Sequence, residues 1–116
     1  MSEPLARVMA EHRGDVRLVA VAGEVDLSNA VALEVEILRH TKDGGGVALD
    51  LSEVGFMDSA GVALLQRLAR TLVKSGRSLR LVAQASSPVG RLVGMTGLEG
   101  LIPRDETVEE ALAALS

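Results

Sequence analysis

The stretch DVRLVAVAGEV, residues 15–25, carries apolar side chains on both faces of an extended chain. Val16 and Leu18 share one face, while Val19 and Val21 lie on the other, because successive side chains of a strand alternate. A strand that is apolar on both sides is usually buried on both sides, as in the middle of a parallel sheet. The stretch therefore predicts a central strand.

The residues before this strand predict a hairpin. Residues 6–13 have a mixed pattern, and Gly14-Asp15 forms a turn signal between them and the central strand. A short turn of this kind is enough to join two antiparallel strands. We therefore expect the first two segments to pair with each other.

Helical and strand patterns alternate in the rest of the chain. Expected helices start after Ser28-Asn29, near Ser59, at Ser86-Ser87-Pro88 and at a capping box formed by Thr107 and Glu110. They end at the glycines of residues 43–46, at Ser75-Gly76, at Gly97 and near Leu115. Expected strands occupy residues 47–51, residues 79–82 and part of residues 98–103, where Pro103 favours a sheet edge.

The resulting order is β-β-α-β-α-β-α-β-α, which predicts an α/β fold with a mixed, mostly parallel sheet flanked by helices. The 116 residues show no repeat, linker or low-complexity tract. We expect one domain over residues 1–116, with a core of about 7–115.

Composition narrows the possible functions. The net charge is −4 and Phe56 is the only aromatic residue, so the chain lacks the cations and stacking rings of a nucleic-acid-binding surface. It has no cysteine, no leader-like N-terminus and no apolar run long enough to cross a bilayer. We expect a cytoplasmic protein that contacts neither membrane nor nucleic acid.

The stretch FMDSAG, residues 56–61, contains the most reactive-looking residue, Ser59. A serine nucleophile needs a base, but His12 and His40 have no spacing that marks either as its partner. Met57 also replaces the glycine of a nucleophile elbow. Carboxylates such as Glu24 and Asp26 are more often solvated acids than magnesium ligands. We therefore predict no enzyme activity, no catalytic residue, no metal and no cofactor.

Ser59 has two compatible interpretations. With Asp58 as N-cap, it would begin a helix, where free backbone N–H groups and the positive helix end can hold a phosphate. Phosphorylation adds a charge of about −1.5 to −2, which would exclude an acidic or apolar partner surface. The residue is thus a candidate binding switch.

Four segments in order resemble the anti-sigma factor antagonists of the STAS domain family. They are GEVDLSNA at residues 23–30, DLSEVGFMDSAG at 50–61, SPVGRLVGMTGL at 87–98 and TVEEALAAL at 107–115. The resemblance covers nearly the whole chain. It implies a non-enzymatic, bacterial partner-switching regulator with the STAS fold.

The resemblance also implies partners and residue roles. The antagonist would bind an anti-sigma factor serine kinase, which itself binds ATP, and so free a sigma factor for transcription. The kinase would phosphorylate Ser59, and a metal-dependent serine phosphatase would reverse this. The implied partner-binding residues are Asp26 and Asp58, surrounded by Glu24, Ser28, Asn29, Ala60 and Gly61. Many relatives carry a second serine where this chain has Ala60, so Ser59 has no competing neighbour.

An alternative hypothesis keeps the fold but not the switch. In a STAS scaffold or ligand-sensing module, Ser59 would only begin a helix, and the same surface would dock another protein or a small anion. The sequence leaves the oligomeric state open between a monomer and a weak dimer.

Overall fold

A computed structural model describes residues 4–116, which form five strands, four α-helices and one short 3-10 helix. Their bounds are β1 (Ala6–Arg13), β2 (Val16–Val25), α1 (Ala30–His40), β3 (Val47–Met57), α2 (Ser59–Lys74), β4 (Leu79–Val82), α3 (Pro88–Thr96), η1 (Leu98–Gly100), β5 (Arg104–Asp105) and α4 (Val108–Leu115). The predicted β-β-α-β-α-β-α-β-α order is confirmed.

The strands form one sheet in the order β1-β2-β3-β4-β5. β1 and β2 pair antiparallel as the expected hairpin, whereas all later neighbours pair in parallel. Gly14 occupies the hairpin turn with a φ of 61°, a left-handed conformation that favours glycine. The mixed, mostly parallel α/β architecture is therefore confirmed.

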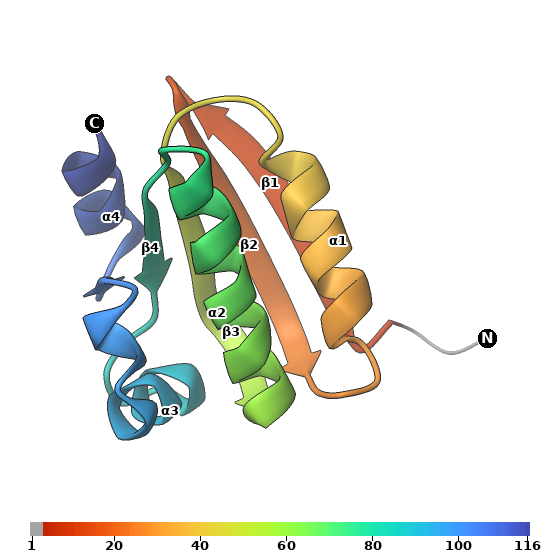
Figure 1. The fold of residues 1–116 in the computed structure, drawn as a ribbon. Helices are drawn as coiled ribbons and strands as arrows, with labels where there is room; N and C mark the ends of the chain where they lie inside the picture. The colour runs from red at the N-terminus through yellow and green to blue at the C-terminus, as the bar shows by residue number, and fades with distance from the viewer. Residues whose placement is uncertain (1–3) are drawn as a thin grey trace.

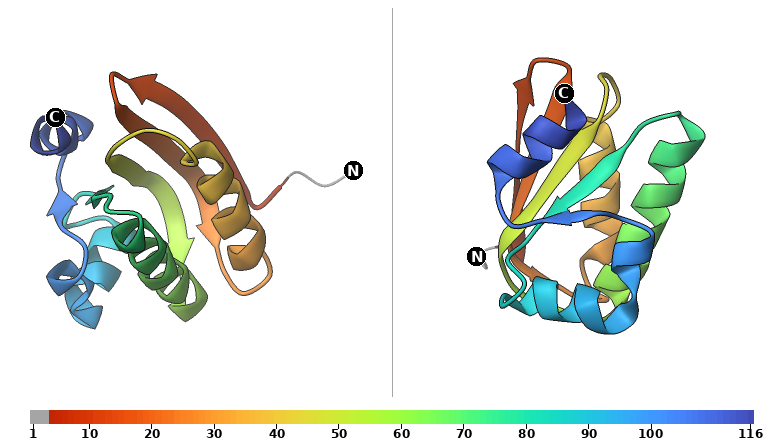
Figure 2. Two further views of the ribbon diagram at one scale, coloured as in Figure 1. Left: turned by 45° about the horizontal axis from the view of Figure 1, so that its top comes forward. Right: turned by 90° about the vertical axis from the view of Figure 1, so that its left-hand side faces the viewer.

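Helices cover the two faces of the sheet unequally. α1 and α2 lie on one face, which we call the inner face, and α4 lies on the other, the outer face (Figures 1 and 2). The inner core contains Val19, Val21 and Leu49 of the strands together with helix residues such as Leu65 and Leu68. β2 also contributes Val16 and Leu18 to a smaller core under α4, so its two apolar faces are both used.

Two segments differ from the sequence-based expectation. The strand expected at residues 47–51 continues to Met57, and only its first four residues pair with β4. The edge strand expected within residues 98–103 is instead the 3-10 helix η1, and the edge strand is β5, just after Pro103. The longer β3 delivers Asp58 and Ser59 directly to the start of α2.

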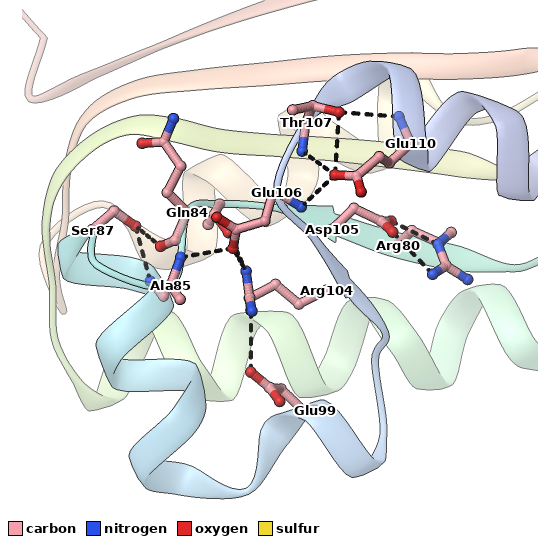
Figure 3. Close-up of polar contacts among 12 residues, drawn as sticks. Arg80, Gln84, Ala85, Ser87, Glu99, Arg104, Asp105, Glu106, Thr107 and Glu110 are labelled. Atoms are coloured by element: carbon pink, nitrogen blue, oxygen red, sulfur yellow. Dashed lines mark hydrogen bonds and ion pairs between the residues drawn. The ribbon is translucent and has the colours of Figure 1, made fainter.

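A polar network fixes the C-terminal segment to the turn between β4 and α3 (Figure 3). Arg104 donates to the Ala83 carbonyl at 2.7 Å, to Glu99 at 3.1 Å and to Glu106. Glu106 accepts the N–H of Ala85 at 2.9 Å. The Arg104 guanidinium, followed by this N–H, holds the pKa of Glu106 below its usual value. The network ties β5 to the start of α3.

Candidate functional site

Ser59 is the first residue of α2 and is exposed to solvent. The preceding residue, Asp58, is the N-cap, and its carboxylate accepts the N–H of Ala60 at 2.9 Å. The predicted cap is therefore present. It fixes the backbone at Ser59 while leaving the serine side chain accessible.

Asp58 also occupies the next N–H groups of the helix. Its carbonyl accepts the N–H of Gly61 at 3.0 Å and that of Val62 at 3.2 Å. The sequence suggested that a phosphate on Ser59 would find free donors at this helix end. Instead, three successive N–H groups after Ser59 already bond to Asp58, so a phosphate would have to compete with it for them.

Asp26 organises the second part of the site, the turn between β2 and α1. Its carboxylate accepts the Ser28 N–H at 2.8 Å and the Ser28 hydroxyl at 2.5 Å. These hydrogen bonds, the one from the hydroxyl first, lower the pKa of Asp26. Asp26 is therefore charged at neutral pH, and the Ser28 hydroxyl is committed to it.

Asn29 supports this turn differently from the expectation. The sequence suggested Ser28 and Asn29 as side-chain caps of α1, but Asn29 makes no side-chain cap bond to that helix. Its Oδ1 accepts the N–H of Asp26 at 2.9 Å, and its Nδ2 donates to the Glu24 carbonyl at 2.8 Å. The side chain thus closes the turn on itself and orients Asp26.

The sheet brings the two acidic segments together. Val25 and Met57 are partners in the parallel pairing of β2 and β3, and the Asp58 N–H donates to the Val25 carbonyl at 3.3 Å. Asp26 and Asp58 therefore follow directly from adjacent strand ends. Figure 1 shows the β2–α1 turn and the start of α2 at the same end of the molecule, opposite the β1–β2 hairpin.

The remaining predicted site residues divide between surface and packing. Glu24 is exposed near the end of β2, beside Phe56 of β3. Ala60 packs partly against the inner core, and Gly61 is buried against Met57. A Cβ atom at Gly61 would lie 2.3 Å from the Met57 Cγ. Ala60 and Gly61 thus support the helix start more than they offer contact area.

Exposed apolar residues at this end were missed in the sequence. Leu27 is 82% exposed and Val31 is 69% exposed, in the turn and the first turn of α1. In the sequence, their apolar side chains cannot be told from core residues of the expected helix. Only the fold shows that they face solvent. Large exposed apolar groups beside a polar rim mark surfaces that contact other proteins. We call Asp26, Leu27, Val31, Asp58 and Ser59 the switch surface.

The two histidines lie away from Ser59. His12 pairs with Arg17 near the β1–β2 hairpin, and His40 is the last residue of α1. Both positions are toward the opposite end of the fold from the start of α2, so neither can act as a base for Ser59 in this conformation. Within residues 4–116, no cluster of three or more potential metal-ligating side chains is found. The same residues include no helix that is both long and apolar enough to span a membrane.

Comparison with known proteins identifies the family. The STAS domain model matches residues 7–111. The anti-sigma-F factor antagonist RsfB of Mycobacterium tuberculosis is 32% identical over 119 residues, covering 99% of this chain and 94% of RsfB. The anti-sigma-B factor antagonist of Bacillus subtilis is 29% identical over 92 residues, covering 79% of this chain and 83% of that protein.

A solved structure agrees with these sequence relationships. The crystal structure of an anti-sigma factor antagonist from Mycobacterium paratuberculosis superposes with a TM-score of 0.86 at 31% identity, covering 99% of this chain and 98% of the other. This chain belongs to the STAS domain family. The resemblance found in its four sequence segments is therefore confirmed.

Proposed function

We propose that this protein is an anti-sigma factor antagonist that binds a serine-kinase anti-sigma factor through the switch surface and is released when Ser59 is phosphorylated. The observation that carries the proposal is the position of Ser59, exposed at the start of α2 and beside the Asp26 turn. Relatives that align over most of this chain are named as antagonists of anti-sigma factors. The proposal assigns their role to this chain.

The composition of the switch surface fits a partner whose cations face the two aspartates and whose apolar or acidic groups cover Ser59. Asp26 and Asp58 supply negative charge, while Leu27 and Val31 supply apolar area that is largely exposed in the free protein. Burying one such aliphatic side chain stabilises a complex by about 1.5–3 kcal/mol. The carboxylates would pair with cations of the partner and set the orientation of binding.

Phosphorylation of Ser59 would oppose this complex in two ways. A phosphate carries a charge of about −1.5 to −2, and its repulsion with a carboxylate of the partner about 6 Å away is roughly 1 kcal/mol in water and about 5 kcal/mol at an effective dielectric near 20. The favourable interaction of the phosphate with the positive N-terminus of α2 offsets only about 0.3–2 kcal/mol of this cost. The nearby N–H groups already bond to Asp58, so in the free protein an exposed phosphate would be solvated mainly by water. Desolvation under a partner would raise the cost further.

The switch would act through one hydroxyl. Ala60 offers no alternative acceptor, and the Ser28 hydroxyl bonds to Asp26. The anti-sigma factor kinase would bind ATP and transfer its γ-phosphoryl group to the Ser59 Oγ, with release of ADP and of the hydroxyl proton. A metal-dependent serine phosphatase would restore the binding-competent form.

The test uses the anti-sigma factor kinase encoded in the same organism, with ATP. Intact-mass measurement should show the gain of one phosphate by the wild type and none by Ser59→Ala. In calorimetry without ATP, Ser59→Ala should bind as tightly as the wild type, while Ser59→Asp should bind at least tenfold more weakly. All three proteins should unfold at nearly the same temperature, because Ser59 is exposed.

Two results would overturn the proposal. Equal affinity of the wild type and Ser59→Asp would remove the switch. Unchanged mass of the wild type after incubation with a kinase that binds it would favour a constitutive STAS scaffold or ligand-sensing module instead.

A further inference from the structure

β1 presents an open backbone edge. Among residues 4–116 it is the outermost strand of the sheet and pairs only with β2. A hollow of about 690 Å³ extends from β1 over the neighbouring elements, and it is lined by residues 6–9 of β1, residues 20–22 of β2, Glu36 of α1, and Asp50 and Glu53 of β3. Eight residues of strand without an internal proline form a template for pairing with another strand.

The pairing with β2 determines which backbone groups face outward. The Glu24 N–H bonds to the Leu5 carbonyl at 3.0 Å, and the Arg17 N–H bonds away from β1, to the Gly46 carbonyl of the β3 side, also at 3.0 Å. Backbone groups of successive residues point to opposite sides of a strand. The odd-numbered residues of β1 therefore bond to β2. The even-numbered residues Ala6, Val8, Ala10 and His12 direct their N–H and C=O groups to the open edge.

The outer face of β1 has a self-complementary charge pattern. Arg7, Met9 and Glu11 alternate along this face, opposite Ala22, Ala20 and Leu18 of β2. Met9 is 75% exposed, and Arg7 and Glu11 are exposed on either side of it. An antiparallel copy of β1 centred on Met9 would place Arg7 of each chain opposite Glu11 of the other.

We propose that this protein forms a two-fold homodimer in which the β1 strands of two copies pair antiparallel with Met9 opposite Met9. In this register, Val8 of one copy and Ala10 of the other exchange backbone hydrogen bonds through their outward groups. Arg7 and Glu11 then occupy non-hydrogen-bonded pairs, where side chains are closest. The two sheets merge into one continuous sheet. Ser59 lies in neither β1 strand, so the dimer is independent of the proposed function.

Charge selects this register over its neighbours. Only the even-numbered residues direct backbone groups outward, so the pairing register of the two strands can change only in steps of two residues. One such shift places Arg7 opposite Arg13, which is repulsive, and the opposite shift places Arg7 opposite Met9, which loses both charge pairs. Glu11 also accepts Arg13 of its own chain at 3.1 Å, so each half of the interface becomes a three-charge cluster. The centred register alone pairs opposite charges and covers Met9.

A charge-swap experiment tests the dimer. Sedimentation equilibrium of the full chain with interference optics suits a protein without Trp or Tyr. The wild type should show a monomer–dimer equilibrium below about 1 mM, the weak end of specific affinities. Arg7→Glu and Glu11→Arg should each raise the dimer dissociation constant about tenfold, because each converts two attractive pairs into repulsive ones. The double variant Arg7→Glu/Glu11→Arg should associate more tightly than either single variant but less tightly than the wild type, because Arg13 of the same chain then lies beside a second cation.

Arg39→Glu, at an exposed site on α1, is the matched control and should associate like the wild type. Circular dichroism of each variant verifies the fold. A wild type that stays monomeric throughout this range would overturn the proposal. So would a double variant that associates no more tightly than the two single variants, since only directly opposed charges can rescue each other.

Discussion

The backbone N–H of Asp58 donates to the carbonyl of Val25 at 3.3 Å, which joins the strand end before the Asp26 turn to the cap of α2. Through this bond, two loops separated by more than thirty residues of sequence share one support. The acidic side chains that follow Val25 and Met57 are thereby held by the sheet itself. Rigid elements position a site more accurately than loops do.

Removing the cap at Asp58 should destabilise the protein. Asp58→Ala loses the hydrogen bond to the Ala60 N–H, and loss of an N-cap costs about 0.5–2 kcal/mol. Asp58→Asn keeps an oxygen acceptor and should retain most of the stability. Urea unfolding followed by circular dichroism measures both. Equal stability of Asp58→Ala and the wild type would show that the cap contributes nothing.

Gly61 and Gly94 should respond oppositely to alanine. A Cβ at Gly61 lies within 3 Å of two Met57 atoms, whereas a Cβ at Gly94 in α3 meets nothing within 4 Å. Overpacking costs about 1–3 kcal/mol, while alanine in a helix gains up to about 1 kcal/mol over glycine. Gly61→Ala should therefore lower the free energy of unfolding, and Gly94→Ala should raise it. Stabilisation by both variants would contradict the packing at Met57.

Ser28→Ala should raise the pKa of Asp26 toward its ordinary value of about 3.9. The Ser28 hydroxyl is the first cause of the lowered pKa, and the variant keeps only the backbone donor. A lowered pKa in the folded state contributes stability above the unfolded pKa, which is lost as pH falls through the folded value. In Ser28→Ala this loss should be smaller and should be complete at a higher pH, because the folded-state pKa lies closer to the unfolded one. Carbon-13 NMR titration of the carboxylate measures the shift, with Ser86→Ala as a control that leaves it unchanged.

Arg104→Ala should be more destabilising than an ordinary surface substitution. The Arg104 side chain is only 18% exposed, and its loss leaves the carbonyl of buried Ala83 without this donor. Removing such a charged hydrogen bond costs about 1–3 kcal/mol. The free energy of unfolding of Arg39→Ala, at an exposed site of α1, should stay within about 0.5 kcal/mol of the wild type. Thermal unfolding compares the two variants. Identical midpoints would show that the network has no structural role.

Leu27→Ser should weaken binding to the anti-sigma factor about 10–100-fold without lowering the unfolding temperature. Leu27 is 82% exposed, so its apolar area is available only to a partner, where burial is worth about 1.5–3 kcal/mol. Val73→Ser is a matched control because Val73 is 66% exposed near the far end of α2. Calorimetric titration compares the three proteins. Equal weakening by both variants would place the contact elsewhere.

Local chemistry explains why most elements could be predicted from the sequence. Thr107 and Glu110 form the complete capping box, and Gly97 ends α3 with a left-handed φ of 72°. Pro88 lies at the start of α3 after Ser87, which caps the Gly90 N–H. These signals depend on residues within one turn of each other. They can therefore be recognised without knowledge of the tertiary structure.

Elements that depend on distant pairing could not be predicted in the same way. The pairing of β2 and β3 shifts register near Ala22 and again at Glu24, so the end of β3 loses the simple alternation of a strand. β5 has only two residues, and Asp105 is held there by Arg80 at 2.7 Å. Asn29 likewise found partners in its own turn instead of in α1. The register shifts and β5 depend on tertiary contacts that residue patterns and propensities do not contain, whereas Asn29 had a choice between two sets of local partners.

The smaller core under α4 has a consequence for local unfolding. α4 contributes one fully buried residue, Ala111, to this core, whereas the supports of Ser59 and Asp26 come from the strand ends and the inner face. Segments with few buried contacts open independently of the rest of a protein. Amide hydrogen exchange should therefore be faster in α4 than in β2 and β3. A molecule with α4 transiently undocked would still present Ser59 and Asp26 in the same geometry.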